Sequence, residues 1–155
     1  MIVIHKPTID DYDAVRALVA QVHALHHAAR SDVYAADAHF SREYYAALLA
    51  DENAFPIAAY DGDRLVGFAS AFMKPANPNP AMLPHRIAYI DDICVHSGCR
   101  GRGIGRLLHN ELVRIAREHG ADTLMLTVWA FNENALRFYK DLGMTERNIN
   151  MEMKL

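Results

Sequence analysis

The stretch Arg100-Gly101-Arg102-Gly103-Ile104-Gly105 is the most informative part of this 155-residue chain. It follows an apolar run at 90–95 and precedes a helical pattern at 107–115. Glycines let the backbone turn sharply and bring its N–H groups close to a ligand. The first N–H groups of a helix lack internal acceptors and favour negative charge, and the arginines here, with Arg106, add positive charge. The order of strand, glycine loop and helix therefore predicts a cradle for a pyrophosphate.

The spacing of the glycines excludes two other phosphate-binding loops. A nucleotide P-loop needs Lys and then Ser or Thr after its last glycine, whereas Gly105 is followed by Arg106 and Leu107. The dinucleotide fingerprint G-x-G-x-x-G also differs from this G-x-G-x-G order. Taken alone, the six residues are also compatible with an arginine-rich surface turn whose glycines serve geometry only.

Composition and length indicate one globular domain over residues 1–155, since 52% of the residues are hydrophobic and 23% are charged. A net charge of −3 argues against a broad nucleic-acid-binding face. The two cysteines, Cys94 and Cys99, form no disulfide framework and fit a reducing compartment. We find no signal peptide and no apolar stretch long enough for a membrane, so we expect a cytoplasmic protein.

Hydrophobic periodicity predicts alternating strands and helices along most of the chain. Thr8 and Ser41 are in position to cap the first two helices, and Asp61-Gly62-Asp63 is typical of a hairpin turn. The pattern predicts an α/β (α+β) fold with a mixed sheet and helices on both faces. Strands are expected at 1–5, 55–60, 64–73, 87–95, 123–129 and 148–154, and helices at about 8–29, 41–51, 104–119 and 132–142.

Two segments leave alternatives open. His23, His26, His27 and His39 lie near the end of the first helix and beyond it. They include a His-x-x-His spacing, but no acidic residue completes a zinc motif, so we favour a helix end that borders a substrate mouth over a metal site. The connection 74–84 contains four prolines and cannot lie inside a sheet. It can serve as a lid, as a dimer contact or simply as a long hairpin connection.

A second motif, Asn132-Glu133-Asn134-Ala135-Leu136-Arg137-Phe138-Tyr139-Lys140-Asp141-Leu142-Gly143-Met144, resembles a segment of the GNAT superfamily of N-acetyltransferases. That segment reads N-x-x-A-x-x-F/L-Y-x-x-x-G-F, and only Met144 departs from it. The glycine stretch is similar to the family's R/Q-x-x-G-x-G/A loop. The resemblance implies a mostly antiparallel central sheet of about six to seven strands with a splayed central strand pair.

The resemblance also implies a cosubstrate, acetyl-CoA, lying in the gap of the splayed strands, and no metal. The Val95 N–H would face the thioester carbonyl, and the N–H groups of 100–106 would hold the pyrophosphate. Asn132 would bind the pantetheine arm or fix the splayed strand. The implied cosubstrate-binding residues are Ile93, Cys94, Val95, Arg100, Gly101, Arg102, Gly103, Ile104, Gly105, Arg106, Asn132, Asn134 and Tyr139.

Acetyl transfer to an amine needs a proton donor for the leaving thiolate and an acceptor for the amine's proton. The resemblance assigns the donor role to Tyr139, although an aromatic at this spacing is also typical of a core. Asp91 is our expected base, acting through water, with Asp92 as the alternative. If no bulge intervenes, Asp91 shares a strand face with Ile93 and Val95. Either carboxylate can instead pair with an arginine. We interpret Cys94 as a packing residue.

We therefore expect an N-acetyltransferase that acts on a primary amine of a small molecule, such as a polyamine or an amino acid. Acidic residues at 32, 37, 91 and 92 hint at a cationic acceptor, and a closed pocket with Tyr34, Tyr44 and Tyr45 would favour one. Two alternatives are a transferase that acts on a protein N-terminus or lysine, and a non-catalytic acyl-CoA sensor. Family analogy alone suggests a homodimer, without nucleic-acid or membrane partners.

Overall fold

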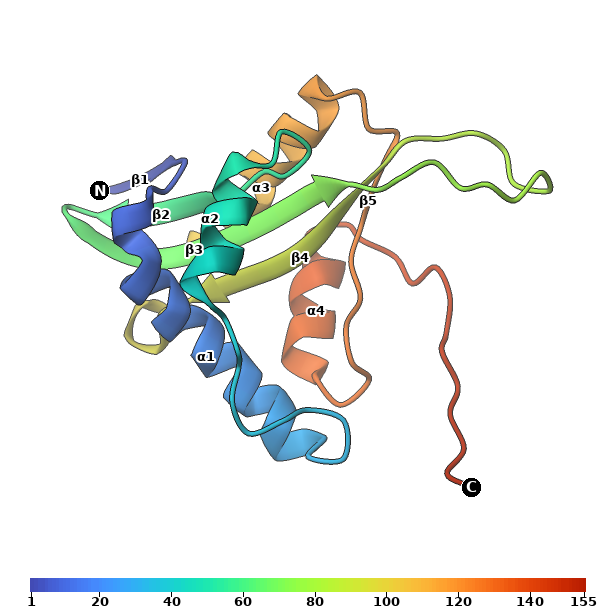
Figure 1. The fold of residues 1–155 in the computed structure, drawn as a ribbon, viewed down its shortest axis with the longest axis horizontal. Helices are drawn as coiled ribbons and strands as arrows, with labels where there is room; N and C mark the ends of the chain where they lie inside the picture. The colour runs from blue at the N-terminus through green and yellow to red at the C-terminus, as the bar shows by residue number, and fades with distance from the viewer.

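The computed structural model describes all 155 residues and contains one mixed sheet in the order β1-β2-β3-β4-β5 (Figure 1). The first four strands are antiparallel neighbours, and β5 runs parallel to β4. The mixed, mostly antiparallel sheet is confirmed, but it has five strands rather than six to seven. The strands are β1 (Ile2–His5), β2 (Ile57–Asp61), β3 (Arg64–Met73), β4 (Ile87–Val95) and β5 (Thr123–Met125).

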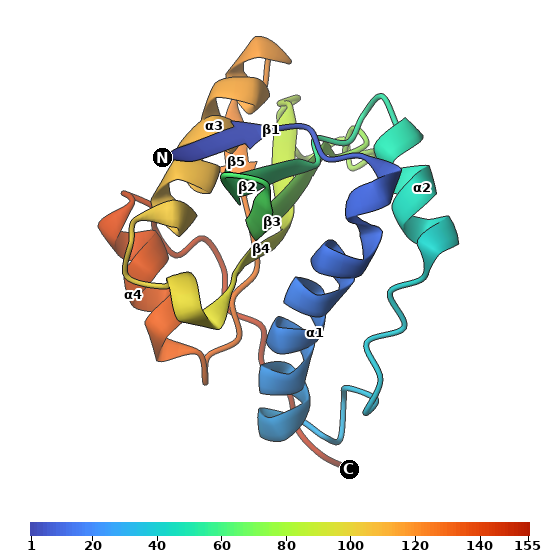
Figure 2. The ribbon, with the colours of Figure 1, turned by 90° about the vertical axis from the view of Figure 1, so that its left-hand side faces the viewer.

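Helices cover both faces of the sheet, as expected. Figure 2 shows α3 and α4 on one face and α1 and α2 on the other. None of them is both long and apolar enough to span a membrane. The helices are α1 (Tyr12–Ala29), α2 (Arg42–Ala50), α3 (Ile104–Glu118) and α4 (Glu133–Asp141), with short 3-10 turns at Ile9–Asp11 and Ser97–Cys99.

The predicted helix starts are confirmed by their capping contacts. The Thr8 backbone N–H donates to the Asp11 carboxylate over 2.7 Å in a capping box ahead of α1. The Ser41 hydroxyl accepts from the Tyr44 N–H over 3.0 Å at the start of α2. These local contacts fix where each helix enters the sheet layer.

Two cores hold the helices on the sheet. On one face of the sheet, α3 packs through Ile104, Leu108 and Leu112. On the other face, Tyr45 of α2 and Phe68 of β3 are completely buried where α1 and α2 meet the sheet. A methyl group at Gly67 of β3 would come within 3.0 Å of Leu108 and 3.1 Å of Ile104. The absence of a side chain at Gly67 therefore lets α3, and the glycine loop before it, approach the sheet closely.

The predicted strand 123–129 is regular over only its first three residues. Tyr89 of β4 pairs with Met125, and no pairing between these two chain segments follows. β4 continues to Val95 while residues 126–129 leave the sheet. The splayed strand pair that the resemblance implied is therefore present, and it opens at Tyr89.

The predicted strand 148–154 does not join the sheet. Residues 145–155 make no backbone–backbone hydrogen bond and extend away from the body of the molecule (Figure 1). A strand needs an adjacent edge with which to form a ladder, and this segment meets none within its own chain. The connection 74–86 likewise projects outward, and it joins the antiparallel neighbours β3 and β4.

The close packing of α3 gives a stability prediction. Leu108→Ala removes a completely buried side chain, so it should lower the free energy of unfolding by about 2–5 kcal/mol in urea titrations. The neighbouring Leu107 is 43% exposed, and Leu107→Ala should cost less than about 1 kcal/mol. Equal costs at the two positions would contradict the assignment of α3's packing face.

Candidate active site

The gap between β4 and residues 126–129 exposes backbone donors. His96 N–H donates to Val66 O of β3 over 2.9 Å. N–H directions alternate along a strand, so the N–H groups of Ile93 and Val95 point away from β3 and into the gap. No strand pairs with them on that side. Two donors of the central strand are thus available to a ligand that enters the gap.

The glycine loop contains a second group of free donors, separated from the first by residues 96–100, whose N–H groups are paired. Gly101 and Gly103 have φ of 77° and 76°, a left-handed conformation in which side chains are strained. None of the six backbone N–H groups from 101 to 106 donates to an acceptor of the chain. The last three belong to the first turn of α3, a 15-residue helix whose dipole favours an anion.

The arginines of the loop differ in their surroundings. Arg102 pairs with Asp61 over 2.8 Å, which neutralises much of its charge. Arg100 donates weakly to Val95 O over 3.4 Å. Arg106 takes part in no ion pair. The positive character expected for the loop therefore comes mainly from backbone N–H groups and from two of its three arginines.

Helix α4 packs against the start of α3. A methyl group at Gly105 would lie 3.1 Å from the Phe138 ring, so this glycine is required for the close approach. The Asn132 side-chain oxygen accepts from Ala135 N–H over 3.1 Å and caps α4. Asn134 is exposed on the first turn of the helix. Asn132 thus has a structural contact through its side-chain oxygen, and its amide NH₂ has no partner in the chain.

Tyr139 of α4 lies close to Cys94 and Asp92 of β4. Burial, followed by the nearby Cys94 and Asp92, raises the pKa of Tyr139 to about 12, so its hydroxyl stays protonated at neutral pH. Burial and then Asp92 raise the pKa of the Cys94 thiol well above its usual value. Cys94 is 2% exposed and belongs to the core under α1, which agrees with a packing role.

A β-bulge places the two aspartates differently from the sequence expectation. Ser70 pairs with Asp92 and Ala71 with Ile90, so Asp91 is the extra residue of β4. The condition under which Asp91 would share a face with Ile93 and Val95, the absence of a bulge, is therefore not met. Asp91 instead lines a pocket on the α2 side of the sheet, and the pairing with Ser70 puts Asp92 on the same side.

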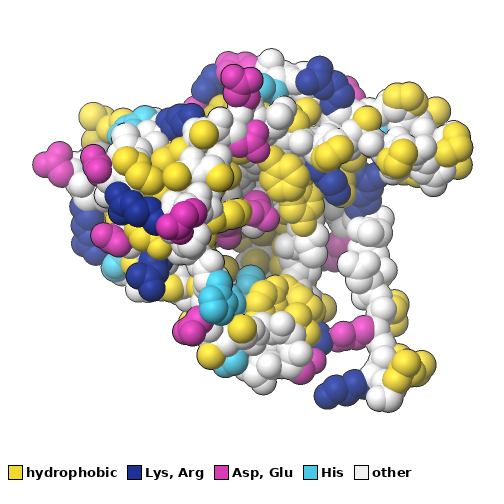
Figure 3. All heavy atoms as spheres, in the orientation of Figure 1, with side chains coloured by type: hydrophobic (Ala, Val, Ile, Leu, Met, Phe, Trp, Pro, Cys, Tyr) yellow, Lys and Arg dark blue, Asp and Glu magenta, His cyan; other side chains and the backbone are white.

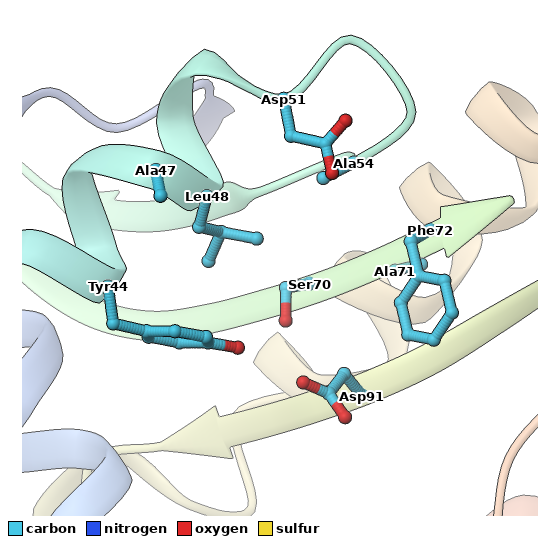
Figure 4. Close-up of a pocket in the computed structure, with 9 residues that line it drawn as sticks. All are labelled: Tyr44, Ala47, Leu48, Asp51, Ala54, Ser70, Ala71, Phe72 and Asp91. Atoms are coloured by element: carbon cyan, nitrogen blue, oxygen red, sulfur yellow. The ribbon is translucent and has the colours of Figure 1, made fainter. Parts of the chain in front are cut away.

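The pocket beside Asp91 has a volume of about 240 Å³ and lies between α2 and strands β3 and β4 (Figure 4). Figure 3 shows this face hollowed next to α2, with acidic side chains near the hollow. Tyr44, Ser70 and Asp91 point toward one another in Figure 4. The Ser70 hydroxyl is 2% exposed and has no hydrogen-bond partner. The other lining residues are Ala47, Leu48, Asp51, Ala54, Ala71 and Phe72.

Burial raises the pKa of both aspartates. Burial, followed by repulsion from Asp91, raises the pKa of Asp92 to about 6. Burial also raises the pKa of Asp91, while a hydrogen bond from the Tyr44 hydroxyl opposes the rise. Neither carboxylate forms an ion pair with an arginine. Two carboxylates that titrate closer to neutral pH than usual therefore lie between the gap and the pocket.

The histidines at the end of α1 support a loop. His23 and His27 bond to the carbonyls of Ala35 and Tyr34 over 2.6 and 2.8 Å. No group of three histidine, cysteine or acidic side chains gathers as it would around a metal ion. Tyr34 accepts from the Trp129 indole N–H over 2.7 Å, which ties the loop to the far wall of the gap.

Several residues of the site were missed by sequence reasoning. Asp51 directly follows α2 and Ser70 lies in β3, and no motif joins them to Asp91. Of the three tyrosines considered, only Tyr44 lines the pocket. Tyr45 lies in the core and donates to Thr8 O over 2.9 Å, and Tyr34 packs against Trp129. Trp129 carried no sequence signal beyond its place at the end of an apolar run.

Comparison with known proteins places the chain in a family. The sequence profile of the acetyltransferase (GNAT) family matches residues 20–144. This match covers most of the chain, which therefore belongs to the GNAT acetyltransferase family. A mutant of the BH1408 protein from Bacillus halodurans is 29% identical, with a TM-score of 0.94 over 99% of both chains.

Curated relatives match over shorter segments. A streptothricin acetyltransferase from Streptomyces lavendulae is 38% identical over 94 residues, which are 61% of this chain and 45% of the relative. A thialysine N-epsilon-acetyltransferase from Bos taurus is 36% identical over 58 residues, which are 37% of this chain and 34% of the relative. The matching part of the chain thus spans less than half the length of either relative.

The raised pKa of Asp92 predicts a pH-dependent stability. In the folded protein the Asp92 carboxyl keeps its proton up to about pH 6, whereas the ordinary pKa of an aspartate is 3.8. Folding stability is therefore lost as the pH rises from 3.8 to about 6. The variant Asp92→Asn has no carboxyl to titrate and does not show this loss. Between pH 4 and pH 7, the difference in free energy of unfolding between the variant and the wild type should shift in favour of the variant by on the order of 1–2 kcal/mol in urea titrations.

Asp91→Asn serves as the control for this titration. It removes the like charge next to Asp92 and so lowers the pKa of Asp92. The fall in stability of the Asp91→Asn variant should therefore end at a lower pH than it does in the wild type. A difference between Asp92→Asn and the wild type that stays constant from pH 4 to 7 would contradict the burial of this carboxyl.

Proposed function

We propose that this protein transfers an acetyl group from acetyl-CoA to a primary amine of a small cationic molecule. The observation that supports this most strongly is a set of unpaired backbone donors in two groups, Ile93 and Val95 of β4 and residues 101–106 of the glycine loop. These donors lie between α4, which bears Tyr139, and the pocket that contains Asp91. Membership of the GNAT family gives independent support.

The residues present fit acetyl-CoA. Six consecutive N–H groups at 101–106, with Arg100 and Arg106, suit a pyrophosphate. The N–H groups of Ile93 and Val95 suit an extended amide-bearing chain that pairs with β4 as a missing strand would. When bound, acetyl-CoA supplies an activated acetyl thioester. The Val95 N–H is then the fixed donor nearest the end of the gap, where charge develops on a carbonyl oxygen.

Tyr139 is the proposed proton donor to the leaving thiolate. Its hydroxyl keeps its proton at neutral pH because burial raises its pKa to about 12. It lies beside Cys94 and Asp92 at the point where the gap meets β4. The phenol also lacks the flexibility of a surface residue, since α4 is held by the contact between Phe138 and Gly105. Tyr139 can therefore deliver one proton from a fixed position.

Asp91 remains the proposed base, and Asp92 the alternative. Asp91 lines the pocket directly, so it can contact the acceptor ammonium, directly or through water. Asp92 has a pKa of about 6, which suits a group that must accept a proton near neutral pH. The bulge at Asp91 turns both carboxylates to one side of the sheet and so allows a proton to pass between them.

The pocket also indicates the class of acceptor. Its lining contains two carboxylates, Asp51 and Asp91, and no lysine, arginine or histidine. The hydroxyls of Tyr44 and Ser70 add polar contacts, and Leu48 and Phe72 supply apolar walls. Two separated anions with apolar surface between them suit an alkyl diamine or polyamine, and a volume of about 240 Å³ suits a small molecule better than a folded protein.

A thiol-release assay with acetyl-CoA and a panel of amines tests the reaction. Turnover should be highest with diamines and polyamines, and Tyr139→Phe should lower kcat about 100-fold with little change in KM for acetyl-CoA. Tyr12→Phe, which removes a hydroxyl bonded to Phe40 O away from the gap, is the matched control and should keep kcat. Acetyl-CoA binding without turnover on any amine or N-terminal peptide would contradict the enzymatic proposal and favour a sensor.

The acceptor class has its own test. Asp51→Asn removes the second carboxylate of the pocket, so KM for a diamine should rise about 10-fold or more while KM for a monoamine of the same length changes little. Asp63→Asn, in the exposed turn between β2 and β3, should leave both constants unchanged. An equal effect of Asp51→Asn on both amines would exclude Asp51 as the binding site for a second cation.

A further inference from the structure

Ser70 carries a buried hydroxyl that no group of the chain satisfies. The residue lies in the middle of β3 and is 2% exposed, and its hydroxyl oxygen has no hydrogen-bond partner. A buried polar group without a partner costs free energy, and an alanine at this position would avoid that cost. The hydroxyl therefore indicates a partner that comes from outside the chain or forms only when a ligand is bound.

The surroundings of Ser70 show where such a ligand would lie. Ser70 lines the pocket of about 240 Å³ together with Tyr44 and Asp91, and the three side chains point toward one another in Figure 4. An ammonium group that entered the pocket and paired with Asp91 would therefore lie beside the Ser70 hydroxyl. A hydroxyl can accept a hydrogen bond from such a group and donate one to a second acceptor at the same time.

The second acceptor is Asp92, which does not line the pocket. In the ladder between β3 and β4, Ser70 is the direct partner of Asp92, and Asp91 is the extra residue of the bulge. The Cβ atoms of directly opposite residues lie about 4.5–5.5 Å apart, a distance that a hydroxyl and a carboxylate can bridge by rotation of their side chains. Ser70 thus adjoins both the pocket and the carboxylate that the pocket does not reach.

The environment of Asp92 suits a group that accepts a proton. Burial, followed by repulsion from Asp91, raises the pKa of Asp92 to about 6. The other ionisable groups near Asp92 are Cys94 of β4, Tyr44 of α2 and Tyr139 of α4, and each of them has a raised pKa and is neutral at pH 7. None of these groups is a cation, so none stabilises the ionised carboxylate against protonation.

We propose that Ser70 relays a proton from the acceptor amine to Asp92. One proton of the bound ammonium passes to Ser70 Oγ, and the proton of the Ser70 hydroxyl passes to a carboxylate oxygen of Asp92. The serine is unchanged, Asp92 is protonated, and the neutral amine retains the electron pair that forms the C–N bond. This inference rests on the proposed function and develops its alternative, in which Asp92 is the base and Asp91 holds the ammonium.

The remaining protons balance without a further base. As the C–N bond forms and the C–S bond breaks, Tyr139 gives its proton to the thiolate. The nitrogen then loses a second proton, which returns through water to the Tyr139 oxygen. Asp92 releases the first proton to solvent at the end of the turnover, so one proton is released for each ammonium that is acetylated.

Kinetics of Ser70 variants test the relay with acetyl-CoA and the amine that the wild type acetylates fastest. Ser70→Ala should lower kcat about 10-fold or more and leave KM for the amine nearly unchanged. Ser70→Thr keeps the hydroxyl, and the pocket beside it leaves room for the methyl group, so kcat should return to within about 3-fold of the wild type. A higher KM with an unchanged kcat would make Ser70 a binding contact and would overturn the relay.

A double-mutant cycle shows whether Ser70 and Asp92 act along one path. Asp92→Asn should lower kcat about as much as Ser70→Ala, and the double variant should be no slower than the slower single variant, because both changes interrupt one transfer. Losses that multiply in the double variant would contradict the relay. Ser31→Ala, at an exposed serine outside the pocket, is the matched control and should keep both kcat and KM.

Stability and turnover of the wild type separate the other outcomes. Ser70→Ala should resist urea at least as well as the wild type, since it removes an unpaired buried hydroxyl. A variant that loses stability together with kcat would indicate a structural role and overturn the relay. An active wild type whose kcat is unaffected by Ser70→Ala overturns the relay alone. A wild type that binds acetyl-CoA but acetylates no amine contradicts the proposed function, and the relay with it.

Discussion

The early end of the ladder between β4 and β5 is the constraint on which the site depends. Pairing stops at Tyr89 and Met125, yet β4 continues for six more residues with its helices packed on both sides. Backbone donors in a folded protein are normally paired, because an unpaired buried group costs free energy. Here the donors of Ile93 and Val95 and those of residues 101–106 are left free, and residues 96–100, whose N–H groups are paired, separate the two groups. The structure therefore contains a gap beside β4 that is lined by free backbone donors and leads toward the positive end of α3.

The bulge at Asp91 determines which side chains lie beside that gap. Without it, Asp91 and Asp92 would face opposite sides of the sheet, and only one could approach the pocket. With it, both carboxylates lie on the α2 side, where burial and mutual repulsion raise the pKa of Asp92 to about 6. Tyr139 approaches the same point of β4 from α4, and its pKa is raised to about 12. A phenol that keeps its proton at neutral pH and two carboxylates with raised pKa values thus meet where the strands separate.

The sequence predicted those parts of the structure that depend on local signals. Glycines at 101 and 103 adopt the left-handed conformation that the loop requires, Thr8 and Ser41 cap their helices, and β3 and β4 have the expected bounds. It did not predict the bulge, because strict alternation was assumed through Asp91, nor the pocket, which is assembled from α2, β3 and β4. The prediction of a last strand at 148–154 was wrong for another reason. The pattern at 148–154 is that of a strand, but a pattern does not specify the edge with which a strand pairs.

Residues 126–129 lie between the gap beside β4 and the C-terminal segment 145–155. One of their edges borders the gap with its free donors, and the other faces the C-terminal segment, whose Arg147 bonds to the Met125 sulfur. Trp129 is held by Tyr34 and by Arg30, so one end of the segment is anchored while its backbone remains unpaired. A ligand that pairs with β4 in the gap would order these residues and would bear the free-energy cost of that ordering. Because Trp129 already fixes one end of the segment, the cost falls on the few residues between Met125 and Trp129.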